Sequence, residues 1–311
     1  MKTALLRLSL LTGLLSAGIS VCSAGGTEGA TPFDFLFLDS AARPAALGGA
    51  YAAVPGGPET LDYNPAGLGL AGSNAAAFNH RSHFQDASQQ TAGLMLKPGF
   101  TAKAPGGFAF TLNTVSFGDI ARTTLSNPSG TGLGDFSIRD WALAAGYGQK
   151  IKDDLYLGIG LKYLRETIDN VSGDAAAIDI GVMLGLEQYG LPVKAGAAIQ
   201  NVGTKVKFQS DREDLPANLK AGLAYNFPGE KAVIALDMNS ARRGESTLHA
   251  GFELKLLEAL KFRLGYNGRN EAANGLTFGA AGTYRDLSLE YAYAPYGDPG
   301  SAGILGVGFK W

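Results

Sequence analysis

The chain has 311 residues, one cysteine and nearly balanced charge, with 26 basic and 28 acidic side chains. Proteins that bind nucleic acid usually carry a basic face, so this balance argues against that class. The 44 glycines follow no Gly-X-Y period, which excludes a collagen-like chain. They lie within apolar, alternating segments, where glycine is typical of strands that bend or closely approach another backbone.

Residues 1–24 have the pattern of a secretory signal peptide. Two basic residues precede an uncharged apolar run from 8 to 21, and small residues follow it. Cys22 also allows lipidation, although Val21 stands where lipidated chains usually have Gly, Ala or Ser. Cleavage after Ala24 removes the cysteine and leaves 24 basic against 28 acidic side chains. No later apolar run reaches the roughly 20 residues of a spanning helix, so membrane insertion would require strands.

Alternating segments fill the chain from about residue 90 to its end, and 176–186 is the clearest. Successive side chains of a strand point to opposite faces. Ile180 and Val182 therefore share an aliphatic face, while Asp179 and Gly181 lie on the other. In a soluble sandwich the aliphatic face would turn to the core, and in a barrel it would turn to lipid. The barrel interpretation predicts that serine is tolerated at Gly181, on the inner face.

The opposite faces are not uniformly apolar. Charged residues among their small neighbours are Asp179, Lys194, Lys220, Asp237, Glu253, Arg263 and Glu290. Facing inward, such mixed charges can pair with one another or with water, which argues against an apolar tunnel.

The pattern predicts fourteen strands in a transmembrane antiparallel β-barrel. The expected spans are 74–80, 90–98, 106–117, 138–148, 154–167, 175–187, 192–202, 216–226, 231–239, 246–255, 259–267, 275–284, 286–294 and 302–311. Connections after odd-numbered strands are the longer ones, including 118–137 and 203–215. Outer-membrane barrels show this sorting when both termini lie in the periplasm, and a sandwich has no reason to show it.

The last predicted strand ends in alternating aromatic residues, including Phe309 and Trp311. This ending resembles the C-terminal signal by which bacterial outer-membrane proteins engage the barrel-assembly machinery. The alternative is an ordinary edge strand, but an unpaired apolar edge favours aggregation. Closure of a barrel removes that edge, so the ending favours a protein embedded in outer-membrane lipid.

Residues 25–73 form a separate N-terminal segment, followed by the barrel at 74–311. Glycines within it allow positive φ and close approach to a wall. Pro65 restricts Asn64 to extended or turn geometry, and the Asn64 side chain can close that turn on nearby backbone. The residues singled out as the motif of this segment are Arg43, Gly48, Gly49, Asn64, Pro65, Ala66 and Gly67.

The order of Phe35-Leu36, Ala42-Arg43, Gly48–Ala52 and Asn64–Leu68 resembles the PorV/PorQ family, within the FadL-like superfamily. The resemblance implies a fourteen-stranded barrel with the N-terminal segment tucked inside as a hatch. It also implies an accessory role in protein export of the type IX kind, with secreted cargo or secretion components as partners. The alternative is a FadL-like channel for uptake of small hydrophobic molecules. The sequence departs from the family pattern at Pro44, Leu47 and 56–58.

The sequence contains only weak matches to catalytic or ligand-binding motifs. Residues 67–72 match G-x-G-x-x-G, but the strand, helix and acidic ligand of a dinucleotide site are missing around them. His80 and His83 could share a metal on a helix, yet they fall at a strand end and in a polar loop, and zinc catalysis usually needs three protein ligands. We therefore expect no catalytic residue, metal, cofactor or nucleic-acid partner.

Overall fold

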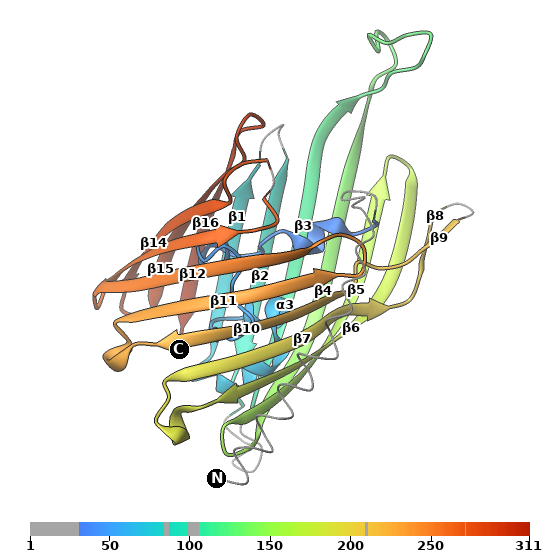
Figure 1. Cartoon of the computed structure of the whole chain (residues 1–311). Helices are drawn as coiled ribbons and strands as arrows, with labels where there is room; N and C mark the ends of the chain where they lie inside the picture. The colour runs from blue at the N-terminus through green and yellow to red at the C-terminus, as the bar shows by residue number, and fades with distance from the viewer. Residues whose placement is uncertain (1–30, 84–86, 99–105, 209–210, 271) are drawn as a thin grey trace.

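A computed structural model describes residues 31–83, 87–98, 106–208, 211–270 and 272–311 (Figure 1). Fourteen antiparallel strands form one closed barrel, which confirms the predicted fold class. The barrel strands are β1 Ala75–Ser82, β2 Ser88–Leu96, β3 Gly106–Ala121, β4 Asp135–Lys152, β5 Leu155–Ile168, β6 Val171–Gly185, β7 Val193–Gly203, β10 Asn218–Asn226, β11 Ala232–Ala241, β12 Ser246–Leu257, β13 Leu260–Asn267, β14 Leu276–Tyr284, β15 Leu287–Pro295 and β16 Ser301–Lys310. Pairing of β1 with β16 closes the barrel.

Each of the fourteen predicted spans corresponds to one barrel strand, and the main error is at the ends of the third and fourth. The connection predicted at 118–137 shortens to 122–134, because β3 and β4 stay paired as far as Ala121 and Asp135. This pair rises well above the rest of the barrel (Figure 1). A register shift between Phe117 and Ile120 interrupts the apolar alternation of β3 there, although backbone pairing continues.

The connection predicted at 203–215 is not an open loop. It contains a two-stranded hairpin, β8 Val206–Phe208 and β9 Asp211–Glu213. Val206 and Leu215 are buried in one apolar cluster with Phe33 and Phe35 from the start of the N-terminal segment. Strands of three residues give no readable alternation, and their burial depends on a segment distant in sequence.

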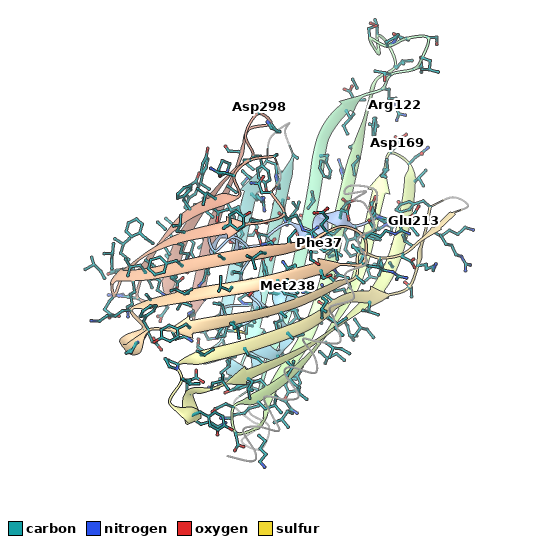
Figure 2. All side chains as sticks on the ribbon, viewed as in Figure 1. Phe37, Arg122, Asp169, Glu213, Met238 and Asp298 are labelled. Carbon is teal, nitrogen blue, oxygen red and sulfur yellow. The ribbon has the colours of Figure 1, made fainter. Side chains whose placement is uncertain are left out.

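The two faces of the barrel wall differ as predicted. Aliphatic and aromatic side chains project from the outer face (Figure 2). Ile180 on this face is 59% exposed. On the inner face Asp179, Lys162 and Arg263 are buried. No helix among the described residues is both long enough and apolar enough to cross a membrane.

The end of β16 is tied to the start of β1. Trp311 and Asn74 exchange two backbone hydrogen bonds of 3.2 Å. The rings of Phe309 and Trp311 stack with centroids 5.7 Å apart, and both remain about half exposed on the outside. Their role as an assembly signal stays a prediction. The predicted signal peptide and Cys22 lie outside the described residues.

Inside the barrel lie residues 31–73 of the N-terminal segment, drawn in blue in Figure 1. They fold into four short elements: η1 Asp34–Phe37, α2 Ala42–Ala46, α3 Thr60–Tyr63 and η2 Pro65–Leu70. Two further single turns, η3 Glu187–Tyr189 and η4 Pro228–Glu230, lie in connections between strands. We call residues 33–70 the hatch.

Candidate functional site: the hatch and its two chambers

The hatch supplies most of the apolar core inside the barrel. Tyr51, Leu61 and Leu68 have no exposed surface, and Leu47 is 1% exposed. Alanines surround them, so short side chains let the hatch backbone approach the wall closely. Because a fourteen-stranded barrel is too wide for its own side chains to fill, the lumen needs such a segment to be closed.

Gly48 and Gly49 adopt the left-handed backbone conformation, with φ of +64° and +82°. A Cβ at Gly48 would overlap the backbone of Tyr266 in β13. Glycine is therefore required at Gly48 both by its dihedral angle and by the wall beside it. Ala42, at the first position of α2, donates its backbone N–H to Oδ1 of Asn79 in β1 at 3.1 Å.

Asn64 joins two parts of the hatch to the wall. Its Oδ1 accepts the backbone N–H of Ala66 at 3.1 Å. Its Nδ2 donates to the carbonyl of Ala52 at 2.7 Å and to that of Val182 in β6 at 3.1 Å. The side chain has no exposed surface; its contacts with Ala66 and Ala52 are buried, and that with Val182 is partly buried. One amide thus fixes a turn and anchors it to β6.

Glycines in the wall face this turn. A Cβ at Gly158 in β5 would overlap the backbone of Pro65 and Ala66, and one at Gly181 in β6 would overlap the Asn64 carboxamide. Gly67 of the hatch is also confined, since its Cβ would come within 2.5 Å of the Thr60 side chain. Gly181 lies on the inner face, as the sequence predicted. The prediction that serine is tolerated there is wrong, because the hatch packs directly against this position.

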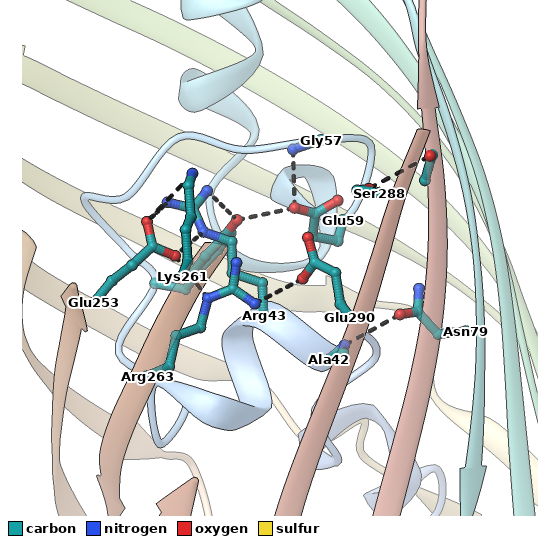
Figure 3. A network of polar contacts seen from close by, with 12 residues as sticks. Ala42, Arg43, Gly57, Glu59, Asn79, Glu253, Lys261, Arg263, Ser288 and Glu290 are labelled. Carbon is teal, nitrogen blue, oxygen red and sulfur yellow. Dashed lines mark hydrogen bonds and ion pairs between the residues drawn. The ribbon is translucent and has the colours of Figure 1, made fainter. Parts of the chain in front are cut away.

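On the opposite wall Arg43 holds α2 through a charged cluster (Figure 3). Its Nε and Nη2 donate to the two carboxylate oxygens of Glu253 in β12 at 3.0 and 3.1 Å. Its Nη1 donates to the Tyr51 hydroxyl at 3.2 Å and the Pro55 carbonyl at 3.1 Å. This paired geometry is the strong form of an arginine–carboxylate contact.

The cluster continues along the wall. Arg263 donates to Glu253 at 2.6 Å and to Glu290 at 2.8 Å. Its side chain is 1% exposed. The Tyr51 hydroxyl donates to Glu59 at 2.9 Å, which ties the hatch to itself. Every buried charge here has a partner, so the cluster can stabilise the docked hatch.

Three further wall residues bind the hatch backbone. Oδ2 of Asp237 accepts the N–H groups of Tyr51 and Ala52 at 2.8 and 2.7 Å. Gln200 donates to the carbonyl of Asp62 at 2.7 Å. His249 Nδ1 lies 2.7 Å from the Gly48 carbonyl. Asp237 stood among the predicted inward charges, but Gln200 and His249 were missed. The usable signal was a polar side chain at an inward position of an apolar strand.

The hatch leaves a chamber on each side. The upper chamber, toward the loops that follow odd-numbered strands, has a cavity of about 50 Å³. The lower chamber, beside the joined ends of β1 and β16, has about 220 Å³. Charged and amide side chains line much of both chambers, including Lys220 and Asn239 above and Arg43 and Lys261 below. An engineered apolar cavity of roughly 150 Å³ holds benzene, so the upper chamber is too small for an aromatic hydrocarbon while the hatch is docked.

The G-x-G-x-x-G match begins in the hatch, and His80 lies in β1. Gly67–Leu70 lie in η2 of the hatch, without the strand–turn–helix of a dinucleotide site. The His80 ring is exposed and lies within hydrogen-bond distance of Ser82 and Gln90. Within the described ranges no three His, Cys, Asp or Glu side chains come together as a metal site.

Solved structures share this architecture. The toluene transporter TbuX of Ralstonia pickettii superimposes with a TM-score of 0.60 at 15% identity, covering 87% of this chain and 98% of that one. A deletion mutant of the monoaromatic hydrocarbon channel TodX gives 0.59 at 13% identity, covering 88% and 98%. At these identities the likeness shows the fold alone, a closed antiparallel barrel of fourteen strands.

No protein-family model and no curated protein matches the sequence. The resemblance to the PorV/PorQ family therefore stands only on the residues of the N-terminal block.

Proposed function

We propose that this protein is an outer-membrane channel for uptake of small molecules and that the hatch closes it. The proposal rests on one observation: the hatch crosses the lumen of a closed barrel and is bound to both walls. A chamber lies above the hatch and another below it. A closed ring of strands satisfies all its backbone hydrogen bonds in a bilayer. The likeness to TbuX and TodX supports transport as the general function.

The outer face supports the membrane location. Leu161, Leu223 and Leu289 are each more than half exposed on β5, β10 and β15. In water such a belt would be an aggregation hazard, whereas lipid solvates it. The predicted signal peptide and C-terminal aromatic residues are consistent with export and insertion.

Removal of the hatch tests the proposal. In planar bilayers we expect the full chain to conduct little and a variant lacking residues 33–70 to give large, stable conductance, because the lumen then fills with water. Assembly of both proteins is checked by the shift in gel migration between heated and unheated samples. An assembled hatch-less barrel without conductance would rule the proposal out.

A role in protein export is the second candidate. It rests on the family resemblance and on the tall β3–β4 hairpin, whose connecting loop 122–134 projects beyond the barrel (Figure 1). Deleting 122–134 separates the candidates. For a channel, solute uptake persists and surface delivery of secreted proteins is unchanged. Loss of surface delivery from an assembled barrel would favour export.

A further inference from the structure

One buried lysine in the upper chamber carries no counter-ion. Lys220 of β10 is 6% exposed, and among the described residues its Nζ makes no hydrogen bond or ion pair. It lies 4.6 Å above the centre of the Tyr63 ring. The neighbouring buried lysine, Lys162, instead contacts Asp179 at 2.7 Å and Asn201 at 2.8 Å. Because a buried charge is costly without a partner, Lys220 is suited to an anion that enters the chamber.

Two carboxamides accompany this lysine. Asn218 precedes it by two residues on the same face of β10, and Asn239 lies opposite it in β11. They are 5% and 6% exposed, and the Oδ1 atom of each lacks a hydrogen-bond partner in the described part of the chain. Both side chains line the upper chamber together with Lys220. The chamber wall thus offers a cation beside two free hydrogen-bond acceptors.

The nearest carboxylates are already engaged by the hatch. Asp39 and Asp237 act on Lys220 electrostatically, but neither forms an ion pair with it. Asp39 accepts the Tyr63 hydroxyl at 2.8 Å, and Asp237 accepts two backbone N–H groups of the hatch. Their charges moderate the cost of burying Lys220, while its ammonium hydrogens stay available to a ligand.

The upper chamber is lined by the cations Lys162, Lys220 and Arg269 and by the anions Asp39 and Asp62, and the lower chamber has a similar small excess of cations. The lower chamber is lined by the cations Arg43, Lys261, Arg263, Arg285 and Lys310 and by the anions Glu59, Asp286 and Glu290. Glu253, which pairs with Arg43 and Arg263, raises the anions to four, so the five cations leave one excess positive charge, although the whole chain has a net charge of −2. A channel whose chambers have this bias favours anionic solutes.

We propose that Lys220, Asn218 and Asn239 bind a short hydroxylated carboxylate. The carboxylate accepts from the Lys220 ammonium, and the hydroxyl donates to a carboxamide oxygen. The cavity of about 50 Å³ admits only a few heavy atoms and leaves no room for an alkyl tail or an aromatic ring. The inference rests on the proposed channel function, for which it names the class of solute.

Binding of lactate to the full chain in detergent tests the site. Saturation-transfer NMR on the wild type should show saturable binding of lactate, weaker binding of propionate, which lacks the hydroxyl, and none of methyl lactate, which lacks the charge. Lys220→Met should weaken lactate binding by about tenfold or more. Lys207→Met removes an exposed lysine of β8 and should leave binding unchanged.

A second variant keeps the test decisive if Lys220→Met fails to assemble. Asn239→Asp places a carboxylate opposite Lys220 with almost no change in volume, so it should assemble normally and abolish lactate binding. Unchanged lactate binding in either assembled variant would overturn the inference. If the hatch-less barrel conducts, two further results would overturn the inference. One is saturable binding of toluene, and the other is absence of lactate binding to the wild type. Absence of conductance without the hatch refutes the channel itself, which separates the two failures.

Discussion

The hatch meets two walls of the barrel in different ways. Toward β4–β6, the turn at Asn64 and η2 dock by close backbone approach, with Gly158 and Gly181 leaving the space and one amide making the bonds. Toward β11–β15, the hatch is also held by charge, through Arg43 and the Asp237 carboxylate. Ions and charged solutes can compete for the second kind of contact and not for the first. We therefore expect the hatch to release first on the Arg43 side and to stay anchored at Asn64.

The contact of the hatch with the β4–β6 wall depends on the space at Gly158. Gly158→Val places side-chain atoms where the backbone of Pro65 and Ala66 runs, and no rotamer relieves that overlap. We expect the largest effect of all the variants here, above the roughly 1–3 kcal/mol typical of overpacking, with the hatch undocked and the assembled barrel constitutively conducting. Bilayer conductance measures it.

The matched control is Gly282→Val in β14, where a Cβ would meet no atom within 4 Å. It should assemble and stay closed like the wild type. A closed channel in assembled Gly158→Val would show that η2 is not the anchor.

The contact of the hatch with the β11–β15 wall depends on Arg43. Arg43→Met removes both bonds to Glu253, whose side chain is only 7% exposed, and the loss should weaken hatch docking by about 3 kcal/mol. Arg263 still pairs with Glu253, so the wall itself should remain intact. Open probability in bilayers should rise by about two orders of magnitude.

Arg122→Met provides the comparison for Arg43→Met. Arg122 pairs with Asp169 at 2.6 Å on the loops above the barrel, where both side chains are more than one-third exposed (Figure 2). Solvent screens such a surface pair, so its loss should not change gating. Equal open probabilities in the two variants would mean that the charged cluster does not hold the hatch.

Asn64→Ala tests how much this one side chain contributes to the contact with the β4–β6 wall. Truncation leaves the N–H of Ala66 and the carbonyls of Ala52 and Val182 without their partner, at a cost of about 1–3 kcal/mol. The backbone packing of η2 persists, so protease cleavage within the hatch should increase more than conductance does. Asn127→Ala, in the exposed 122–134 loop, should change neither. Conductance equal to that of the hatch deletion would place the whole anchor in this one side chain.

The strands could be predicted from sequence because the apolar residues on the outer face of a barrel recur with a period of two, regardless of what lies inside. The inner face has no such rule. Whether Gly181 faces an open lumen or the Asn64 carboxamide depends on a contact over more than a hundred residues of chain. Likewise the sequence predicted Glu253 only as an inward charge. Its pairing with Arg43 depends on the position of the hatch in the structure. The motif residues of the hatch were thus identifiable, whereas their partners on the wall were not.

The smallest expected effect is a dependence of closure on pH through Asp62, which lies on the hatch in α3. Burial raises the pKa of its carboxyl, and this outweighs the lowering by Lys162 and by hydrogen bonds from Ser40 and Thr111. The docked pKa is therefore higher than that of an undocked, solvated hatch. The ionised carboxylate disfavours docking, so closure is strongest at low pH and weakens as pH rises through the raised pKa.

Open probability should accordingly rise in the wild type as the pH increases through the raised pKa of Asp62, and Asp62→Asn should flatten that rise. The exposed Asp298, in the loop between β15 and β16, gives the control Asp298→Asn, which should keep the wild-type profile (Figure 2). A rise of equal size in Asp62→Asn would assign the pH dependence to the wall carboxylates instead. The site of release would then lie on the barrel side of the contact rather than on the hatch.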